Sequence, residues 1–202
     1  LGARRLDYDQ LVGLVGFFDL PPGDRLHRAL VEAIPCGWWY SAPLPGGGAV
    51  AGLFTDSDLV RDLGLLDEAV WGDLLAASPH TRDALCGGRL RERPQLVPAP
   101  SQRLLETAGP GWIAAGDAAA SFDPLSSMGV GHAVTSGIHA ARVAHDALSG
   151  DGALLAPYIR GVDRHGREYL DLRERTYGLE RRFADQPFWA RRQRRERLAK
   201  GA

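Results

Sequence analysis

The chain has 202 residues, of which 45% are hydrophobic and 24% charged, enough to bury one or two globular cores. Its formal net charge of −1 offers no overall attraction to nucleic acid or to an anionic membrane, and we expect neither as a partner. No apolar run reaches the roughly 18 residues of a membrane span, and two cysteines are too few for a metal cage or a disulfide framework. We therefore expect no metal and a cytoplasmic location. The strong preference for Arg over Lys is typical of a GC-rich bacterial genome.

Residues 1–95 are predicted to form a β-rich substrate-binding domain with short helices. Closely spaced apolar runs separated by Gly/Pro turns predict a mostly antiparallel sheet, with extended segments at 11–20, 30–34, 37–44 and 49–55. A further short extended piece at 95–98 leads towards the next strand of the chain. Residues that can cap helices precede three short helical stretches, which we place at 56–63, 67–77 and 78–85.

The run at 37–43 reads GWWYSAP and is rich in aromatic residues. Because successive strand side chains point to opposite faces, Trp38 and Tyr40 share one face, and Trp39 and Ser41 share the other. Aromatic strand residues usually pack in a core, but the pattern equally fits the wall of a substrate pocket. Both interpretations stay open, because the two faces can serve different purposes. The candidate pocket residues are Trp38, Trp39, Tyr40, Ser41 and Pro43.

The most informative stretch is Gly111–Ala133, which reads GWIAAGDAAASFDPLSSMGVGHA. Gly111–Ala115 is predicted to be a strand, and a helix is predicted to begin within two residues of Ser127 and to end at Leu148. The strand would deliver the Asp117 carboxylate at its C-terminal end, and the helix N-terminus would offer free N–H groups. That combination suits a polyol chain attached to an electron-rich ring. The alternative is an ordinary strand–loop–helix in which Asp and Ser only cap the helix.

The predicted helix carries an apolar stripe that permits close approach to a sheet or a ligand. Its members are Val130, Val134, Ile138, Ala141, Ala144 and Leu148. Three histidines also lie on this helix, but their spacing prevents them from sharing one metal ion. We expect His139 and His145 to be solvated or to cap the helix, whereas His132, one turn into the helix, could line the edge of a ring.

Residues 151–202 are predicted to form helices with heavily charged faces, at 154–180 and 188–200. The arginine pairs of this end alternate with acidic residues, as in solvated helices, so we do not expect them to bind nucleic acid. Phe188 and Trp189 are expected to anchor the tail onto the body of the protein.

The order GDAA…DPLSSxG resembles the flavin motif of the FAD-dependent aromatic hydroxylases and the flavin-dependent (tryptophan) halogenases. In that superfamily the Asp accepts hydrogen bonds from the ribityl chain of FAD. The Pro and the following small residues lie along the isoalloxazine ring, and the helix N-terminus faces the flavin C2 carbonyl. The resemblance therefore implies FAD as cofactor. The FAD-binding residues that it implies here are Gly116, Asp117, Ala118, Pro124, Ser126, Ser127, Gly129, Val130 and Gly131.

The aromatic run carries a second resemblance, to the Trp-x-Trp-x-Ile-Pro segment of flavin-dependent halogenases. Trp38 and Pro43 match that segment, whereas Tyr40 stands for the second Trp and Ala42 for the Ile. Flavoproteins that serve quinone-cofactor amine oxidases carry similar degenerate versions. A maturation flavoprotein for such an oxidase is therefore an alternative function.

Flavoproteins of this kind normally open with a G-x-G-x-x-G fingerprint after a first strand, and the sequence contains none. The chain also begins at Leu1 rather than at a methionine, in sequence typical of the middle of a protein. We therefore expect this chain to be the C-terminal portion of a longer flavoenzyme, with a fold of mixed α/β (α+β) class. An antiparallel-rich substrate-domain sheet would be joined to the last strand and helices of a Rossmann-like FAD-binding domain. The predicted domains are 1–95 for substrate, 96–150 for FAD and 151–202 for the C-terminal helices.

The resemblance implies that reduced FAD would react with dioxygen, either to oxygenate an aromatic or amino-acid-derived substrate or to oxidise halide. A flavin reductase or a protein substrate would be the partner. A halogenase also needs a lysine near its substrate, and the only lysine is Lys200. The sequence assigns no catalytic residue. The alternative from another class is a remnant without cofactor, or a protein-binding module.

Overall fold

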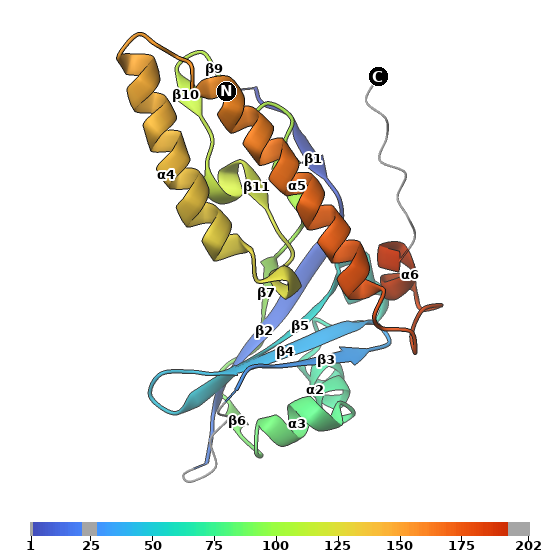
Figure 1. The fold of residues 1–202 in the computed structure, drawn as a ribbon. Helices are drawn as coiled ribbons and strands as arrows, with labels where there is room; N and C mark the ends of the chain where they lie inside the picture. The colour runs from blue at the N-terminus through green and yellow to red at the C-terminus, as the bar shows by residue number, and fades with distance from the viewer. Residues whose placement is uncertain (1, 22–27, 194–202) are drawn as a thin grey trace. The chain divides into compact units, whose positions relative to one another are not determined.

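The computed structural model describes residues 2–21 and 28–193, and these form two compact units (Figure 1). The first, which we call the motif unit, comprises the described residues of Leu1–Gln10 and Ala99–Thr176. The second, the sheet unit, comprises those of Leu11–Pro98 and Tyr177–Ala202. The three segments expected from the sequence, with boundaries at residues 95 and 150, divide the chain by function and stay a prediction.

The sheet unit is built on a six-stranded antiparallel sheet with the order β3-β4-β5-β2-β6, in which β7 also pairs with β2. The strands are β2 (Leu11–Asp19), β3 (Leu30–Ile34), β4 (Gly37–Pro43), β5 (Gly48–Asp56), β6 (Arg89–Leu90) and β7 (Gln95–Pro98). The predicted antiparallel sheet is thereby confirmed. Alternation in these strands buries one set of side chains against helices, as the burial of every second residue along much of β2 illustrates.

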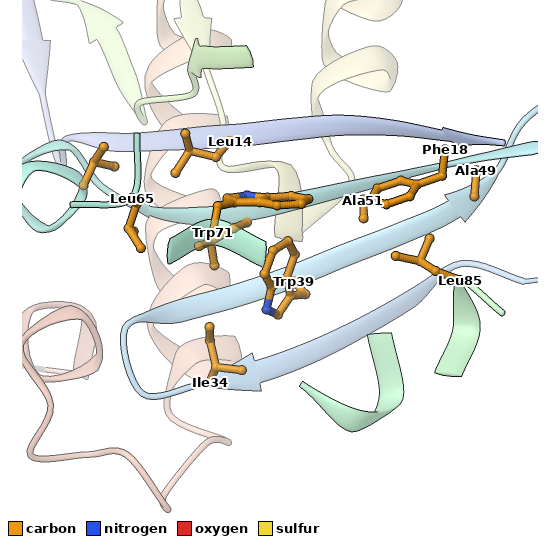
Figure 2. Close-up of a cluster of buried hydrophobic side chains, with 11 residues drawn as sticks. Leu14, Phe18, Ile34, Trp39, Ala49, Ala51, Leu65, Trp71 and Leu85 are labelled. Carbon is orange, nitrogen blue, oxygen red and sulfur yellow. The ribbon is translucent and has the colours of Figure 1, made fainter. Parts of the chain in front are cut away.

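Three short helices follow β5, namely α1 (Ser57–Asp62), α2 (Glu68–Ala76) and α3 (Pro79–Ala84). Asp67 caps α2 by accepting a hydrogen bond from the Ala69 N–H at 2.9 Å. The core lies between these helices and the sheet, where Trp39 of β4 meets Trp71 of α2 edge-on at 5.1 Å (Figure 2). Burial of such large aromatic and aliphatic side chains is the main force that holds helices to the sheet.

The sheet unit is closed by α6 (Pro187–Gln193), whose Phe188 and Trp189 are buried. The Trp189 indole N–H donates to the Ile34 carbonyl at 2.8 Å, which confirms that this segment is anchored. The rest of the helix predicted for 188–200 lies outside the described residues.

The prediction of solvated arginines is wrong for Arg192. Its side chain is buried, and it donates to the buried Asp56 carboxylate at 2.6 and 3.0 Å. The sequence allowed either Asp56 or Ser57 as the cap of α1, and Asp56 stands at the N-cap position, but its side chain makes no capping hydrogen bond. It binds Arg191 at 2.9 Å instead, in addition to Arg192. Alternating charge cannot distinguish a solvated arginine from one whose acidic partner lies far away in the sequence.

The motif unit contains a three-stranded antiparallel sheet, β1-β8-β11, a small hairpin, β9-β10, and two long helices. Figure 1 shows these helices, α4 and α5, running side by side. The elements are β1 (Arg5–Asp7), β8 (Gln102–Leu104), β9 (Ala108–Gly109), β10 (Trp112–Ile113), β11 (Ala120–Ser121), α4 (Gly129–Leu148) and α5 (Leu155–Tyr177). Single 3-10 turns lie at η1 (Gly116–Ala118) and η2 (Pro124–Ser126). Within the two described ranges, no helix is both long and apolar enough to cross a membrane.

The strand predicted at Gly111–Ala115 is shorter than expected. Only Trp112–Ile113 pair, and they pair with β9 in a tight hairpin. The reason is the turn at Pro110–Gly111, where Gly111 adopts φ +77° and sends the chain back along Ala108–Gly109. The start of the following helix at Gly129, two residues after Ser127, is confirmed.

The predicted stripe on α4 has the expected period, but it lies on the outside of this chain. Val130, Val134 and Ile138 are 81%, 59% and 51% exposed. The helix instead buries the side that carries His132, Ser136, Ala140 and Val143. Periodicity identifies two faces of a helix, and the neighbours that the chain supplies decide which face is inside.

Candidate functional site

The Gly-Asp pair of the motif lies in η1, which packs against α4. Gly116 has φ +56°, a conformation that favours glycine, and its N–H donates to the Ser136 hydroxyl at 2.9 Å. A Cβ at Gly116 would lie 3.4 Å from the Ala133 methyl, so the turn sits closely on the helix. Asp117 is the central residue of this turn and is exposed. It lies four residues after the end of β10, within the 3-10 turn, and therefore not at the end of a strand, where the sequence had predicted it.

The next loop carries Asp123 inside and presents its neighbours outside. The Asp123 carboxylate accepts from the Leu125 N–H at 2.9 Å, and its carbonyl accepts from the Ser126 hydroxyl at 2.7 Å. Ser127 ends η2 in the left-handed conformation with φ +54°. This reversal leaves Pro124 and Ser127 exposed. The loop therefore presents small, rigid groups at the entry to α4.

Two residues of α5 hold this loop from behind, and no sequence motif predicted them. The Tyr169 hydroxyl accepts from the Asp123 N–H at 2.9 Å and lies 2.5 Å from the Ser101 hydroxyl. Arg173 donates to the Asp9 carboxylate at 2.9 Å, and its Nε lies 3.9 Å from the Asp123 carboxylate. Burial, and then the Asp123 charge, raise the pKa of Tyr169, so the phenol stays protonated. We call these five residues the clamp.

The first turn of α4 is open to a ligand. The residue before the helix, Met128, makes no side-chain cap, and the first N–H groups of a helix have no partner within the helix. Val130 and Gly131 are exposed, and Gly129 and Gly131 leave open space where a side chain would otherwise project. The positive end of the helix dipole therefore faces a surface without bulky cover.

His132 lies directly behind this surface. Its ring stacks on the His165 ring of α5, with centroids 5.1 Å apart, and meets Phe122 edge-on at 4.8 Å. Burial, and then the charge of His165, lower the pKa of His132, and the opposing influences of Asp117 and of a hydrogen bond with the Gly116 backbone are weaker. The imidazole is therefore held in its neutral form. Its expected place at the edge of a ring stays a prediction.

The other two histidines of α4, His139 and His145, are exposed, as expected. In the part of the chain that the structure describes, no three His, Cys, Asp or Glu side chains gather as metal ligands would.

The aromatic block contributes mainly to packing in the sheet unit. Trp38 stacks on Phe54 with centroids 4.3 Å apart and donates to the Tyr177 hydroxyl at 3.0 Å. Trp39 faces the helices, as described above, and Ser41 is buried beside it on the same face. Tyr40 and Pro43 are exposed. The core interpretation thus holds for both tryptophans, and the substrate-pocket role of the block stays a prediction.

No family model matches the chain, but two curated bacterial proteins do. The chain is 35% identical over 193 residues to the putative FAD-dependent oxidoreductase LodB of Marinomonas mediterranea, which covers 95% of this chain and 52% of LodB. It is 30% identical over 125 residues to the tryptophan 2-halogenase of Chondromyces crocatus, which covers 60% of this chain and 24% of that enzyme. The chain thus spans about half the length of the first relative and about a quarter of the second.

Solved structures also resemble this chain. The peptidyl tryptophan dihydroxylase QhpG, essential for tryptophylquinone cofactor biogenesis, is 26% identical with a TM-score of 0.76, over 98% of this chain and 46% of that protein. The myxobacterial chondrochloren halogenase CndH is 22% identical with a TM-score of 0.79, over 94% and 46%. The flavin-dependent halogenase CmlS is 23% identical with a TM-score of 0.77, over 93% and 36%. The last two likenesses concern the fold, and they confirm the predicted mixed α/β class.

Proposed function

Because the homologues and structural neighbours of this chain are FAD-dependent oxidoreductases and flavin-dependent halogenases, we propose that it forms the flavin-side half of an FAD site. The observation that carries the proposal is the close packing of the Gly116–Asp117 turn on α4. It supports a site in which one exposed carboxylate and one open helix N-terminus serve the same ligand.

The residues fit the flavin half of FAD. Asp117 would accept hydrogen bonds from the ribityl hydroxyls, and Pro124 and Ala118 would lie along the isoalloxazine ring. The N–H groups of Gly129 and Gly131 would face the electron-rich edge of the ring. When bound, FAD supplies the redox chemistry. The clamp behind Asp123 keeps the loop in position, and the remaining proposed contacts come from Gly116, Ser126, Ser127 and Val130.

The substrate we propose is an aromatic, amino-acid-derived compound, and an indole is the best-supported class. One relative is a tryptophan 2-halogenase, and one structural neighbour is a peptidyl tryptophan dihydroxylase. The reaction would be monooxygenation or halogenation. Lys200, the only lysine of the sequence, lies outside the described residues.

A maturation flavoprotein for a quinone-cofactor amine oxidase is the second candidate. The observation that favours it is the similarity to QhpG, which extends over 98% of this chain. The partner would then be a protein substrate, whereas the first candidate needs a small molecule and a flavin reductase. A reducing bacterial cytoplasm suits both candidates, since Cys36 and Cys86 are both free thiols.

The experiment joins this chain to the segment of LodB that it does not match and measures FAD binding by fluorescence quenching. We expect the joined protein to bind FAD and Asp117→Ala to weaken binding. Loss of a charged acceptor costs about 1.5–3 kcal/mol, which is roughly tenfold to a hundredfold in affinity. Asp151→Ala, which removes an exposed carboxylate beyond the far end of α4, is the matched control and should change nothing.

The outcome against the proposal is a folded joined protein that binds no FAD, which would support a remnant without cofactor or a protein-binding module. If FAD binds, the products decide between the chemistries. The loaded protein is supplied with a reductase, dioxygen and either tryptophan or a tryptophan-containing peptide, with and without bromide. Mass spectrometry then distinguishes added oxygen from added bromine and a free substrate from a peptidyl one.

A further inference from the structure

A cavity of about 730 Å³ lies between α4 and α5, the two long helices that run side by side in Figure 1. Pockets of this size hold small organic molecules. Gly131 of α4 and Gly161 of α5 line it, and neither has another group within 4 Å of the place where a Cβ would project. The two glycines therefore leave room for another molecule between the helices. The apolar residues of the wall include Val143, Leu154, Pro157 and Val162.

The cavity is largely separate from the proposed flavin site. Ser127 and Gly131 line both, whereas Asp117 and Pro124 do not line the cavity. From Gly131 the cavity extends along α4 to Arg142, which lies about 16 Å further on at a rise of 1.5 Å per residue. A molecule in the cavity would therefore lie beyond the place proposed for the flavin.

The charged side chains of the cavity favour an anion. Arg142 from α4 and Arg164 from α5 line it, and Glu168 is the one carboxylate among its described lining residues. Arg164 lies 3.9 Å from Glu168, so these two charges offset each other. Arg142, in contrast, makes no ion pair with any residue in the two described ranges. Its guanidinium offers a planar fork of N–H donors, which matches the geometry of a carboxylate.

The other end of the cavity is aromatic and polar. His132 and His165 line it, and their rings are stacked with an interplanar angle of 10°. The His132 Nε2 is buried and has no hydrogen-bond partner among the described residues. Buried polar atoms in folded proteins nearly always have a partner. A flat ring that carries a polar atom would suit this end better than an aliphatic chain would.

We propose that the cavity between α4 and α5 binds a small aromatic carboxylate. The ring would lie among the apolar side chains of the two helices, and the carboxylate would pair with Arg142. This inference goes beyond the proposed function, because it adds a second ligand site that needs no FAD.

The test measures binding of two matched probes to this chain by isothermal titration calorimetry. Indole-3-acetate has the ring and the charge, whereas indole-3-acetamide has the same ring without the charge. Arg142→Gln removes the positive charge. Its control is Arg167→Gln, at an exposed position of α5 that does not line the cavity.

A second variant fills the space between the helices. Gly161→Leu places a large side chain in the cavity, and leucine favours a helix more than glycine does, so the variant should fold. Its control is Gly137→Leu, because Gly137 also has open space around it but does not line the cavity. Circular dichroism checks the folding of both variants. Arg142→Gln tests the proposal independently, since it changes an exposed side chain.

We expect the acid to bind at least about tenfold more tightly than the amide. Arg142→Gln should remove that preference, and Gly161→Leu should weaken binding of both probes at least about tenfold. The two control variants should bind both probes as the unaltered chain does.

Four results would overturn the proposal. They are no binding of the acid, equal affinity for acid and amide, unchanged binding by Gly161→Leu, and an equal loss in either control variant. The last two would place the ligand elsewhere on the chain. Hexanoate that binds as tightly as indole-3-acetate would reject the aromatic ring as the recognised group.

Discussion

At the scale of single residues, His132 makes the stability of the motif unit depend on pH. Its pKa in the folded chain is lowered by burial and by His165. A group whose folded pKa lies below its unfolded value binds fewer protons when folded. The free energy of unfolding therefore falls as the pH drops below the ordinary histidine value of about 6.5.

We accordingly predict that the chain loses more stability than its His132→Gln variant between about pH 7.5 and about pH 5.5. Urea unfolding followed by circular dichroism at the two pH values measures the difference. His145→Gln, at an exposed position of the same helix, controls for the loss of an imidazole as such. An equal loss of stability in the chain and the His132 variant would contradict the argument.

Tyr169 shows how much the clamp depends on one hydroxyl group. In Tyr169→Phe the buried N–H of Asp123 loses its acceptor, and an unsatisfied buried donor costs about 1–3 kcal/mol. We predict a decrease of this size in the free energy of unfolding from chemical denaturation. Tyr40→Phe, which removes a hydroxyl from an exposed side chain, should change stability by less than about 0.5 kcal/mol. Similar effects of the two variants would mean that the clamp does not hold the loop.

At the scale of elements, two glycines should respond in opposite ways to the same substitution. A Cβ at Gly37, where β4 begins, would lie 2.1 Å from the Phe54 carbonyl oxygen of β5, so the strands would have to move apart. We predict that Gly37→Ala destabilises the sheet unit by about 1–3 kcal/mol. Gly72 lies within α2 with open space around it. Gly72→Ala should therefore stabilise the chain by about 0.5–1 kcal/mol.

Thermal and urea unfolding of both variants check this pair. A neutral Gly37 variant would show that β4 and β5 can separate at that point without loss. A destabilising Gly72 variant would show that α2 is packed more closely than the structure indicates.

The elements that could be predicted from the sequence are those specified by local pattern. Alternation and Gly/Pro turns identified β2 to β5, because each strand carries its own period. The hairpin at Trp112–Ile113 was read as a longer strand, because Ala114 and Ala115 continue the apolar run and the sequence does not show where pairing with β9 ends. The stripe on α4 could be predicted, but its outward direction could not, since the sequence shows two faces of the helix but not what covers them.

The candidate site also has parts that could be predicted from the sequence and parts that could not. The Gly116–Asp117 turn and the Asp123–Ser127 loop could be located because their residues are contiguous and ordered. The clamp could not, because its other four members, Asp9, Ser101, Tyr169 and Arg173, come from three separate segments and are common residue types. Glu32 of β3 could not be identified from the sequence either. Its carboxylate accepts from the Thr81 N–H and hydroxyl at 2.7 Å and so caps the start of α3, which lies far away in the sequence.

At the scale of the whole molecule, the proposed half-site sets a limit on what this chain can bind alone. The flavin half of FAD would gain a few hydrogen bonds, each with a net value of about 0.5–1.5 kcal/mol. Loss of translational and rotational freedom on binding costs at least about 4 kcal/mol. The pyrophosphate and adenosine would find no glycine-rich turn in this sequence. The net free energy of binding of the flavin half is therefore small. Because the ADP half finds no site, it should add nothing to the affinity.

We therefore predict that the isolated chain binds FAD weakly, with a dissociation constant no better than about millimolar, and binds riboflavin equally weakly. Riboflavin is the matched ligand, because it has the ribityl chain and the isoalloxazine ring but lacks the ADP half. Titration of the chain into each flavin, followed by fluorescence quenching, measures both constants. Stoichiometric binding of FAD, more than about tenfold tighter than that of riboflavin, would mean that this chain holds an ADP site of its own.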